Sequence, residues 1–222
     1  MSFETIKVVL VGESGTGKTS IIQQFAYKIF DQDCATSISS QYITKVMTFP
    51  DINKNLRIEI WDTAGQERYR SMAKLFYKDA KIVIFVYDVT SKKSFDELIK
   101  YWIPEVQNTS DGSAIFGLVA NKSDLYEIEA VSTEEGMNLA DKIKAVFQKT
   151  SAKSGMGVNN LFNNLGKLYL QPDFDYKEGD LIEQENYNKK KMKENQNKEE
   201  DAESNPSVKI VNYNNKKQKR CC

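Results

Sequence analysis

A glycine-rich loop that directly follows the first apolar run sets the strongest limit on the fold of this chain. Residues 6–11 read IKVVLV, which is apolar except for Lys7 and mostly β-branched, and residues 12–19 read GESGTGKT, which fits the pattern G-x-x-x-x-G-K-[ST]. This pattern needs a strand before the loop and a helix after it, so that backbone N–H groups and the positive helix end converge on phosphate oxygens. Lys18 would add a cation and the Thr19 hydroxyl a ligand for Mg²⁺. The alternative is a glycine turn with an incidental lysine.

The other apolar runs predict a sheet of mainly parallel strands. They alternate with helix-length amphipathic stretches, and two of them flank a predicted hairpin at residues 50–55. We therefore predict an α/β fold, a doubly wound P-loop domain whose mostly parallel six-stranded sheet has one antiparallel edge strand and helices on both faces. The predicted strands are residues 6–11, 42–49, 56–61, 82–87, 115–120 and 145–150.

Two stretches predict helices with an apolar face. One covers residues 158–170, and the other covers residues 94–107, where apolar side chains recur at helical spacing. The side chains predicted to share the face of the second helix are Phe95, Leu98, Ile99, Trp102 and Val106.

The composition changes once, near residue 170, beyond which Asn, Lys, Glu and Gln predominate. We predict a folded domain over residues 1–170 and a disordered tail over residues 171–222. The 31 Lys and Arg residues balance the 31 Asp and Glu residues, so we expect no nucleic-acid partner. Three cysteines and no histidine argue against a disulfide framework and against the commonest zinc ligand, which suits a reducing cytosol.

A second polar segment follows the third predicted strand, where residues 61–68 read WDTAGQER. Asp62 at the strand end could hold Mg²⁺ through water, and the Gly65 N–H could contact a terminal phosphate. Gln66 could orient an attacking water. The alternative is a capped helix start after a buried strand.

Two further segments concern the base of a nucleotide. Residues 121–124 read NKSD after the fifth predicted strand, and the Asp124 carboxylate could accept from both the N1–H and the 2-amino group of guanine. Adenine lacks both donors, so a buried carboxylate there would reject it strongly. Residues 151–153 read SAK after the sixth strand, and their backbone could donate to guanine O6 while Lys153 packs near the base.

These four loops, in this order, resemble those of the Ras superfamily of small GTPases over about residues 5–170. Within that superfamily the chain is similar to the Rab branch in Trp61, in residues 68–71 (RYRS) and 76–80 (FYKDA), and in the cysteine pair 221–222. Ser2, in place of glycine, argues against the myristoylated Arf branch.

The resemblance implies roles for individual residues. Gln66 would orient water and Lys18 would stabilise phosphate charge, which makes both catalytic. The metal ligands would be Thr19, Ser37 and Asp62. Tyr42, Trp61 and Phe76 match the aromatic triad that Rab proteins present to effectors. The residues implied to bind GTP and GDP are Ser14, Gly15, Thr16, Gly17, Lys18, Thr19, Ser20, Phe30, Ser37, Gly65, Asn121, Lys122, Asp124, Ser151, Ala152 and Lys153.

The metal ligand in switch I departs from the family pattern. At the position of Ser37 the family usually has threonine, and Ile-Gly follows it. In this chain residues 36–39 read TSIS. Serine keeps the hydroxyl but lacks the methyl group that restricts its rotamers, so we expect nucleotide switching with a less firmly ordered GTP state. Thr36 is the alternative ligand if the loop is shifted by one residue.

The resemblance also implies slow hydrolysis of GTP to GDP, with Mg²⁺ as cofactor, that an activating protein accelerates. The other expected partners are an exchange factor, a GDP-dissociation inhibitor, a prenylation escort protein and GTP-state effectors. Two alternatives remain. One is a scaffold that scarcely hydrolyses GTP, suggested by Ser37 and Ser39, and the other is an ATP-dependent P-loop enzyme such as a kinase, against which Asp124 argues.

The end of the sequence predicts membrane attachment. Basic residues 216–220 (KKQKR) precede Cys221 and Cys222, and the resemblance implies that both cysteines are prenylated. Two lipid chains beside a basic segment allow stable anchoring, whereas a pair of exposed thiols is the alternative. We expect a switch in vesicle trafficking on the cytosolic face of an endomembrane, cycling with the cytosol. Residues 12–14 (GES) and 68–71 favour endosomes by analogy.

Overall fold

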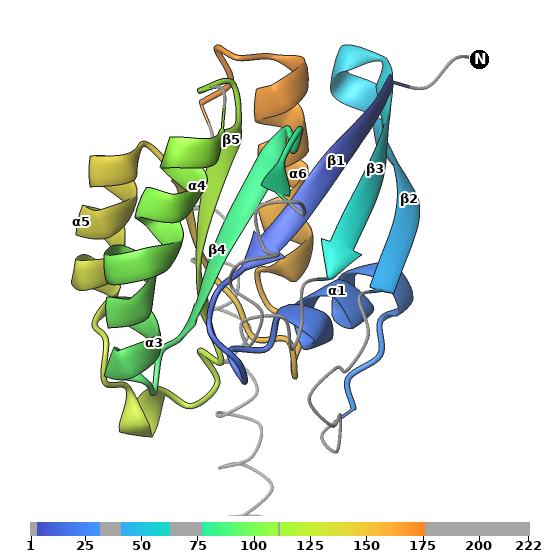
Figure 1. The fold of residues 1–222 in the computed structure, drawn as a ribbon. Helices are drawn as coiled ribbons and strands as arrows, with labels where there is room; N and C mark the ends of the chain where they lie inside the picture. The colour runs from blue at the N-terminus through green and yellow to red at the C-terminus, as the bar shows by residue number, and fades with distance from the viewer. Residues whose placement is uncertain (1–3, 32–40, 63–76, 111, 176–222) are drawn as a thin grey trace, which may run out of the picture. The chain divides into compact units, whose positions relative to one another are not determined.

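The computed structural model describes residues 4–31, 41–62, 77–110 and 112–175 (Figure 1). Predictions made above for Ser37, Gly65, Gln66, Phe76, Cys221 and Cys222 lie outside the described residues. The elements are β1 (Glu4–Val11), α1 (Lys18–Tyr27), β2 (Gln41–Phe49), β3 (Lys54–Asp62), β4 (Ile82–Asp88), α3 (Lys92–Glu97), α4 (Ile103–Thr109), β5 (Ile115–Asn121), α5 (Thr133–Ile143), β6 (Val146–Lys149) and α6 (Val158–Leu170).

The strands form one six-stranded sheet in the order β2-β3-β1-β4-β5-β6. The β2–β3 pair is antiparallel and the other pairs are parallel, which confirms the predicted mixed sheet with one antiparallel edge strand. All six predicted strands are present. The central strand β4 reads IVIFVYD and is buried along its whole length, because a parallel strand between two layers of helices needs apolar side chains on both faces.

Helices cover both faces of the sheet and divide its core into two. Successive side chains of a strand point to opposite faces. Val8 and Leu10 of β1 therefore pack with side chains of α1 and α6, whereas Val9 and Val11 pack with side chains of α3, α4 and α5. In Figure 1 the second group of helices lies on the left of the sheet.

The helix predicted over residues 94–107 is part of a longer helical segment with a wide turn in its middle. A π-helical turn, Leu98–Trp102, joins α3 to α4, and the N–H of Ile103 donates to the carbonyl of Leu98. The prediction that Ile99 shares the buried face is wrong, because Ile99 is 44% exposed while Leu98 and Trp102 are buried. A π-helical turn holds one extra residue, so the spacing of an ideal helix fails across it.

The tip of the β2–β3 hairpin is tied to the last turn of α6. A single 3₁₀ turn, Pro50–Ile52, links the two strands. The Lys54 Nζ donates to the carbonyl of Leu170 at 3.0 Å, and the Lys167 Nζ lies 2.6 Å from Asp51 Oδ2. We call these two contacts the hairpin clasp. It fixes the end of α6 against the edge of the sheet.

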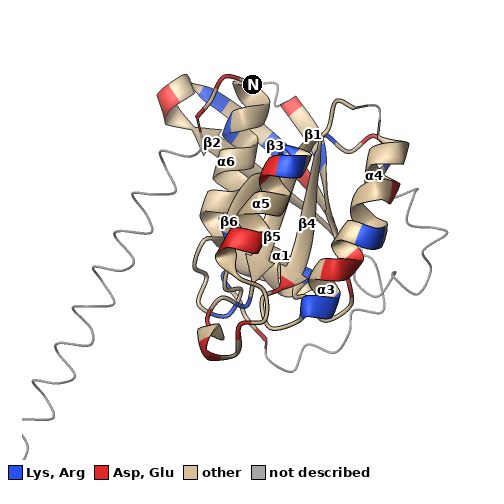
Figure 2. Ribbon diagram, turned by 90° about the vertical axis from the view of Figure 1, so that its left-hand side faces the viewer, with Lys and Arg blue, Asp and Glu red and all other residues tan. Residues whose placement is uncertain are grey.

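Charged side chains of both signs are interspersed along the helical segment that runs from α3 through the π-helical turn to α4 (Figure 2). This mixture matches the balanced composition of the chain. Among the described helices, none is long and apolar enough to cross a membrane.

Candidate functional site

The loops singled out in the sequence leave the sheet at one edge. Leu10 in β1 is paired with Asp62 in β3, and Asp88 in β4 is paired with Asn121 in β5, so these strands end side by side. The glycine-rich loop of residues 12–19, which we call the phosphate loop, therefore starts at a strand end that neighbours those of Asp62 and the NKSD segment. In doubly wound sheets ligands bind at the carboxyl ends of the strands, where these segments lie.

Glycines in the phosphate loop allow the backbone to approach its neighbours closely. Gly12 has a φ of 145°, and a Cβ there would lie 2.2 Å from the carbonyl oxygen of Val86. Gly17 has a φ of 90°, and a Cβ there would lie 2.3 Å from Asn121 Nδ2. Both angles belong to backbone conformations that favour glycine. The loop can take this course only without side chains at these two positions.

The loop curls around the ammonium group of Lys18. The Lys18 side chain is buried, and its Nζ donates to the carbonyls of Gly12 at 2.7 Å and Glu13 at 2.8 Å. Thr16 Oγ1 also donates to the Glu13 carbonyl, at 2.9 Å. Helix α1 begins at Lys18, so its first N–H groups open onto the same loop. A cation and a helix N-terminus thus meet at one place, and both attract the negative charge of a phosphate group.

Asn121 ties the phosphate loop to the loop after β6. Its Nδ2 donates to the carbonyl of Thr16 at 2.8 Å. Its Oδ1 accepts from Thr150 Oγ1 at 3.0 Å and from the N–H of Ala152 at 3.3 Å. The side chain is 1% exposed. Asn121 was predicted from the resemblance as a nucleotide-binding residue, and the described contacts give it a structural part in holding three loops together.

Replacing Asn121 with alanine should destabilise the fold. The change would leave the buried partners Thr16, Thr150 and Ala152 without the amide, at a cost of about 1–3 kcal/mol for each buried group that stays unpaired. We expect the free energy of unfolding, measured in urea without added nucleotide, to fall by roughly 3 kcal/mol.

Asn159→Ala is the matched control, because the Asn159 amide is exposed and its Oδ1 accepts from the exposed Lys28 Nζ. Its effect should stay within about 0.5 kcal/mol. Equal effects of the two substitutions would show that the three-loop contact of Asn121 contributes little.

The Asp124 carboxylate is held by the loop after β6. Ser151 Oγ donates to Asp124 Oδ1 at 2.6 Å, and the same hydroxyl accepts from the N–H of Ser154 at 3.1 Å. Ser151 is buried, whereas Lys153 beside it is exposed. A carboxylate has about four lone-pair sites, so one serine donor leaves capacity for two further donors. The structure thus brings together the NKSD and SAK segments that the sequence analysis linked to a base.

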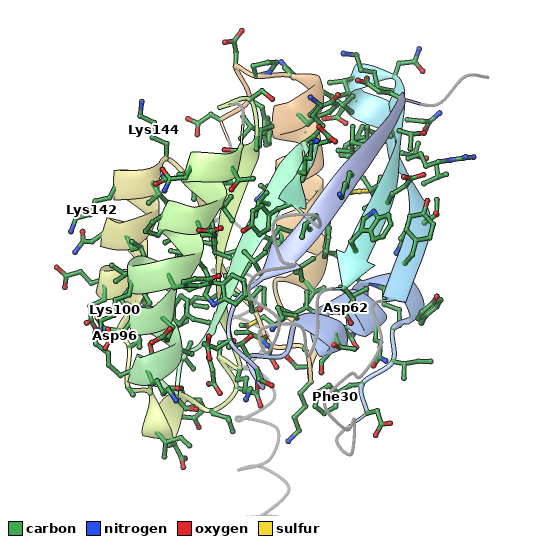
Figure 3. The ribbon with its side chains drawn as sticks, viewed as in Figure 1. Phe30, Asp62, Asp96, Lys100, Lys142 and Lys144 are labelled. Atoms are coloured by element: carbon green, nitrogen blue, oxygen red, sulfur yellow. The ribbon has the colours of Figure 1, made fainter. Side chains whose placement is uncertain are left out.

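An oxygen-rich corner lies at the ends of β3 and the phosphate loop. Asp62 ends β3 and is 1% exposed, and Thr19 is the second residue of α1 and is 9% exposed. Carboxylate and hydroxyl oxygens are ligands that Mg²⁺ accepts while it keeps several waters. The donor chemistry of this corner therefore fits the ion. Figure 3 shows Asp62 at the lower end of β3, with the half-exposed Phe30 below it.

Aromatic side chains gather on the outer face of β2 and β3. Tyr42 is half exposed and packs edge-on against Trp61, with ring centroids 5.2 Å apart. The Lys7 Nζ lies 5.2 Å from the centre of the Trp61 ring and donates to the carbonyl of Lys78 at 2.9 Å. Burial lowers the pKa of Lys7, and the charge of Asp79 opposes the shift. Lys7 was not singled out in the sequence analysis.

Sequence reasoning also missed Asp88. It ends β4, and its Oδ2 lies 2.6 Å from the Nζ of Lys122. The rule that drew attention to Asp62, a carboxylate at the end of a buried strand, would have found Asp88 as well.

Comparisons with known proteins agree with this geometry. A model of the Ras family matches residues 7–171. Ras-related protein RabC of Dictyostelium discoideum is 40% identical over 160 residues, which cover 72% of this chain and 81% of the relative. Ras-related protein RGP2 of Oryza sativa subsp. japonica is 38% identical over 159 residues, which cover 72% of each chain.

Proposed function

The chain belongs to the Ras family of small GTPases, which hydrolyse GTP, and on that basis we propose that it is a Rab-like switch anchored to the cytosolic face of an internal membrane and active in vesicle trafficking. The observation that carries the nucleotide part is the Asn121 amide, which joins the phosphate loop to the loop after β6. The name of the relative RabC and the Tyr42–Trp61 pair support the Rab part.

In this proposal two groups of residues hold the nucleotide. Lys18, the N-terminus of α1 and residues 14–20 bind the phosphates, with Gly65 on the terminal phosphate. Asp124, Lys122 and residues 151–153 hold the guanine, and Phe30 flanks it. The Ser151 hydroxyl keeps Asp124 oriented before guanine arrives, which lowers the entropy lost on binding.

Thr19, Asp62 and Ser37 would hold Mg²⁺, which when bound neutralises developing phosphate charge. Gln66 orients the water for in-line attack on the terminal phosphate, and Lys18 stabilises the charge that develops there. Lys18 is already fixed by two loop carbonyls, so little reorganisation is needed as the charge grows. An activating protein would supply the further stabilisation.

The switch would act through segments that contact the terminal phosphate only in the GTP state. Ser37 and Gly65 are the proposed contacts. Tyr42, Trp61 and Phe76 would form the surface that effectors read, and Lys7 supports it because its ammonium lies over Trp61. An exchange factor, a GDP-dissociation inhibitor and a prenylation escort protein complete the proposed set of partners. Endosomes are the compartment that the sequence analogy favours.

Deleting Cys221 and Cys222 should move the full chain from the membrane fraction to the soluble fraction of a prenylation-competent cell. One lipid chain gives only marginal, reversible binding, at about 0.8 kcal/mol per buried CH₂, whereas two give durable anchoring. Single substitutions should give intermediate distributions. GTP binding and hydrolysis by the purified variants should match the wild type.

Reversing the charges of residues 216, 217, 219 and 220 is the matched comparison, since each basic residue contributes only about 1 kcal/mol near an anionic surface. This variant should stay on membranes more than the double deletion does. Full membrane retention after loss of both cysteines would refute anchoring through them.

A further inference from the structure

We infer that Asp88 is a positioning residue for the nucleotide pocket, which fixes the Lys122 side chain before guanine nucleotide binds. The inference rests on the proposed role of Lys122 in holding the nucleotide. Asp88 ends β4 and lies outside the four loops singled out in the sequence. Its carboxylate nevertheless reaches the NKSD segment from a neighbouring strand end.

The Asp88 carboxylate is itself rigidly held. Asp88 is 7% exposed and ends β4, in register with Asn121 at the end of β5. Its Oδ1 accepts from the N–H of Thr90 at 2.9 Å and from Thr90 Oγ1 at 2.8 Å. The N–H of Val89 donates to the carbonyl of Asn121 at 3.0 Å, which joins the two strand ends. Oδ2 is therefore presented in one direction, toward the following loop.

Lys122 meets this carboxylate from a strained turn. Its φ of 64° lies in the left-handed region, which is uncommon for a residue with a side chain and recurs at functional sites. Its Nζ lies 2.6 Å from Asp88 Oδ2, and the two side chains are 36% and 11% exposed. Lysine has many rotamers, and this ion pair selects one of them. The pair also balances the lysine charge at the edge of a pocket that already holds Lys18.

Without the Asp88 carboxylate, Lys122 would have to be ordered when the nucleotide binds. The entropy of immobilising one such side chain corresponds to a change in affinity of about two- to tenfold. Because the Asp88–Lys122 contact involves the NKSD segment, it should affect retention of the nucleotide and leave the attack of water on the terminal phosphate unchanged.

The test uses the full chain loaded with a fluorescent GDP analogue, whose release is followed in excess unlabelled GDP. Asp88→Asn and Lys122→Gln should each speed release by about two- to tenfold, and the double variant should be no faster than the faster single variant. Lys122→Arg, which keeps a cation within reach of Asp88, should release more slowly than Lys122→Gln. In the Asp88→Asn background, Lys122→Arg and Lys122→Gln should release the analogue at the same rate.

Glu129→Gln is the matched control. It removes the carboxylate of another lysine pair, Lys149 Nζ to Glu129 Oε1 at 3.7 Å, and should release the analogue at the wild-type rate. Single-turnover hydrolysis of bound GTP should be equal in wild type and Asp88→Asn, which separates positioning from general damage to the pocket. The comparison of Lys122→Arg with Lys122→Gln tests the pair even if Asp88→Asn folds poorly.

Two results would overturn this inference without touching the proposed function. One is release of the analogue by Asp88→Asn at the wild-type rate, and the other is a double variant whose increase in release rate equals the product of the two single increases. Failure of the wild type to bind the GDP analogue would instead contradict the proposed function. The two failures are therefore distinguishable in the same experiment.

Discussion

Wild-type protein is expected to bind GDP at least about 10⁴-fold more tightly than ADP, and Asp124→Asn should shift this preference from guanine toward xanthine. A carboxylate placed to accept from guanine N1–H and the 2-amino group loses both of these donors when adenine enters, and keeps only the Ser151 hydroxyl. The asparagine amide can still accept from N1–H, but its NH₂ group meets the 2-amino group of guanine and suits the 2-oxo group of xanthine. Ser151 Oγ, 2.6 Å from Oδ1, can donate to the amide oxygen as well.

Competition of GDP, ADP and xanthosine diphosphate against a labelled guanine nucleotide measures this preference. Glu127→Gln provides the control, because Glu127 is an exposed acid in the same loop and should leave the preference unchanged. Equal affinity of the wild type for adenine and guanine nucleotides would refute the role of Asp124 and favour the ATP-dependent alternative.

Gln66→Leu is expected to retain GTP binding while losing most of the acceleration by an activating protein, which in related enzymes is on the order of 10⁵-fold. Leucine can neither donate to nor accept from the attacking water, whereas Gly65 and the phosphate loop remain. Single-turnover hydrolysis with and without the activating protein measures the loss. The rate without that protein should change far less, because it is slow already.

Gln107→Leu makes the same chemical change at an exposed position of α4 and should be accelerated like the wild type. If Gln66→Leu were accelerated equally well, water would be oriented by another group. A wild type that no activating protein accelerates would instead favour the scaffold alternative suggested by Ser37 and Ser39.

The fold could be predicted from local sequence wherever the pattern of side chains agrees with the conformation that the backbone adopts. The β-branched run before Gly12 could only become a buried strand, because both of its faces meet apolar helices. The glycines of the phosphate loop were predicted from phosphate chemistry, and Gly12 and Gly17 are also required by close contacts with Val86 of β4 and Asn121 of β5. Ile99 was placed wrongly because hydrogen bonding in the π-helical turn depends on tertiary packing that spacing alone does not encode.

The site was less predictable than the fold, because its internal contacts join residues far apart in the sequence. The motifs drew attention to Asn121 and Ser151, but the link from Asn121 to Thr16 spans 105 positions. Asp88 and Lys7 belong to no motif and act through neighbours that only strand register brings near. Chemistry that needs a fixed spacing along the chain is readable from sequence, whereas chemistry assembled across the sheet requires the fold.

Tension on the chain beyond α6 would be borne first by the hairpin clasp. Lys54 holds the Leu170 carbonyl at one end of β3, whereas Asp62 borders the candidate pocket at the other end. The nine residues of β3 separate these points by roughly 27 Å at about 3.3 Å per residue. A pull from a membrane tether would therefore load the β2–β3 ladder as a whole before it displaced Asp62.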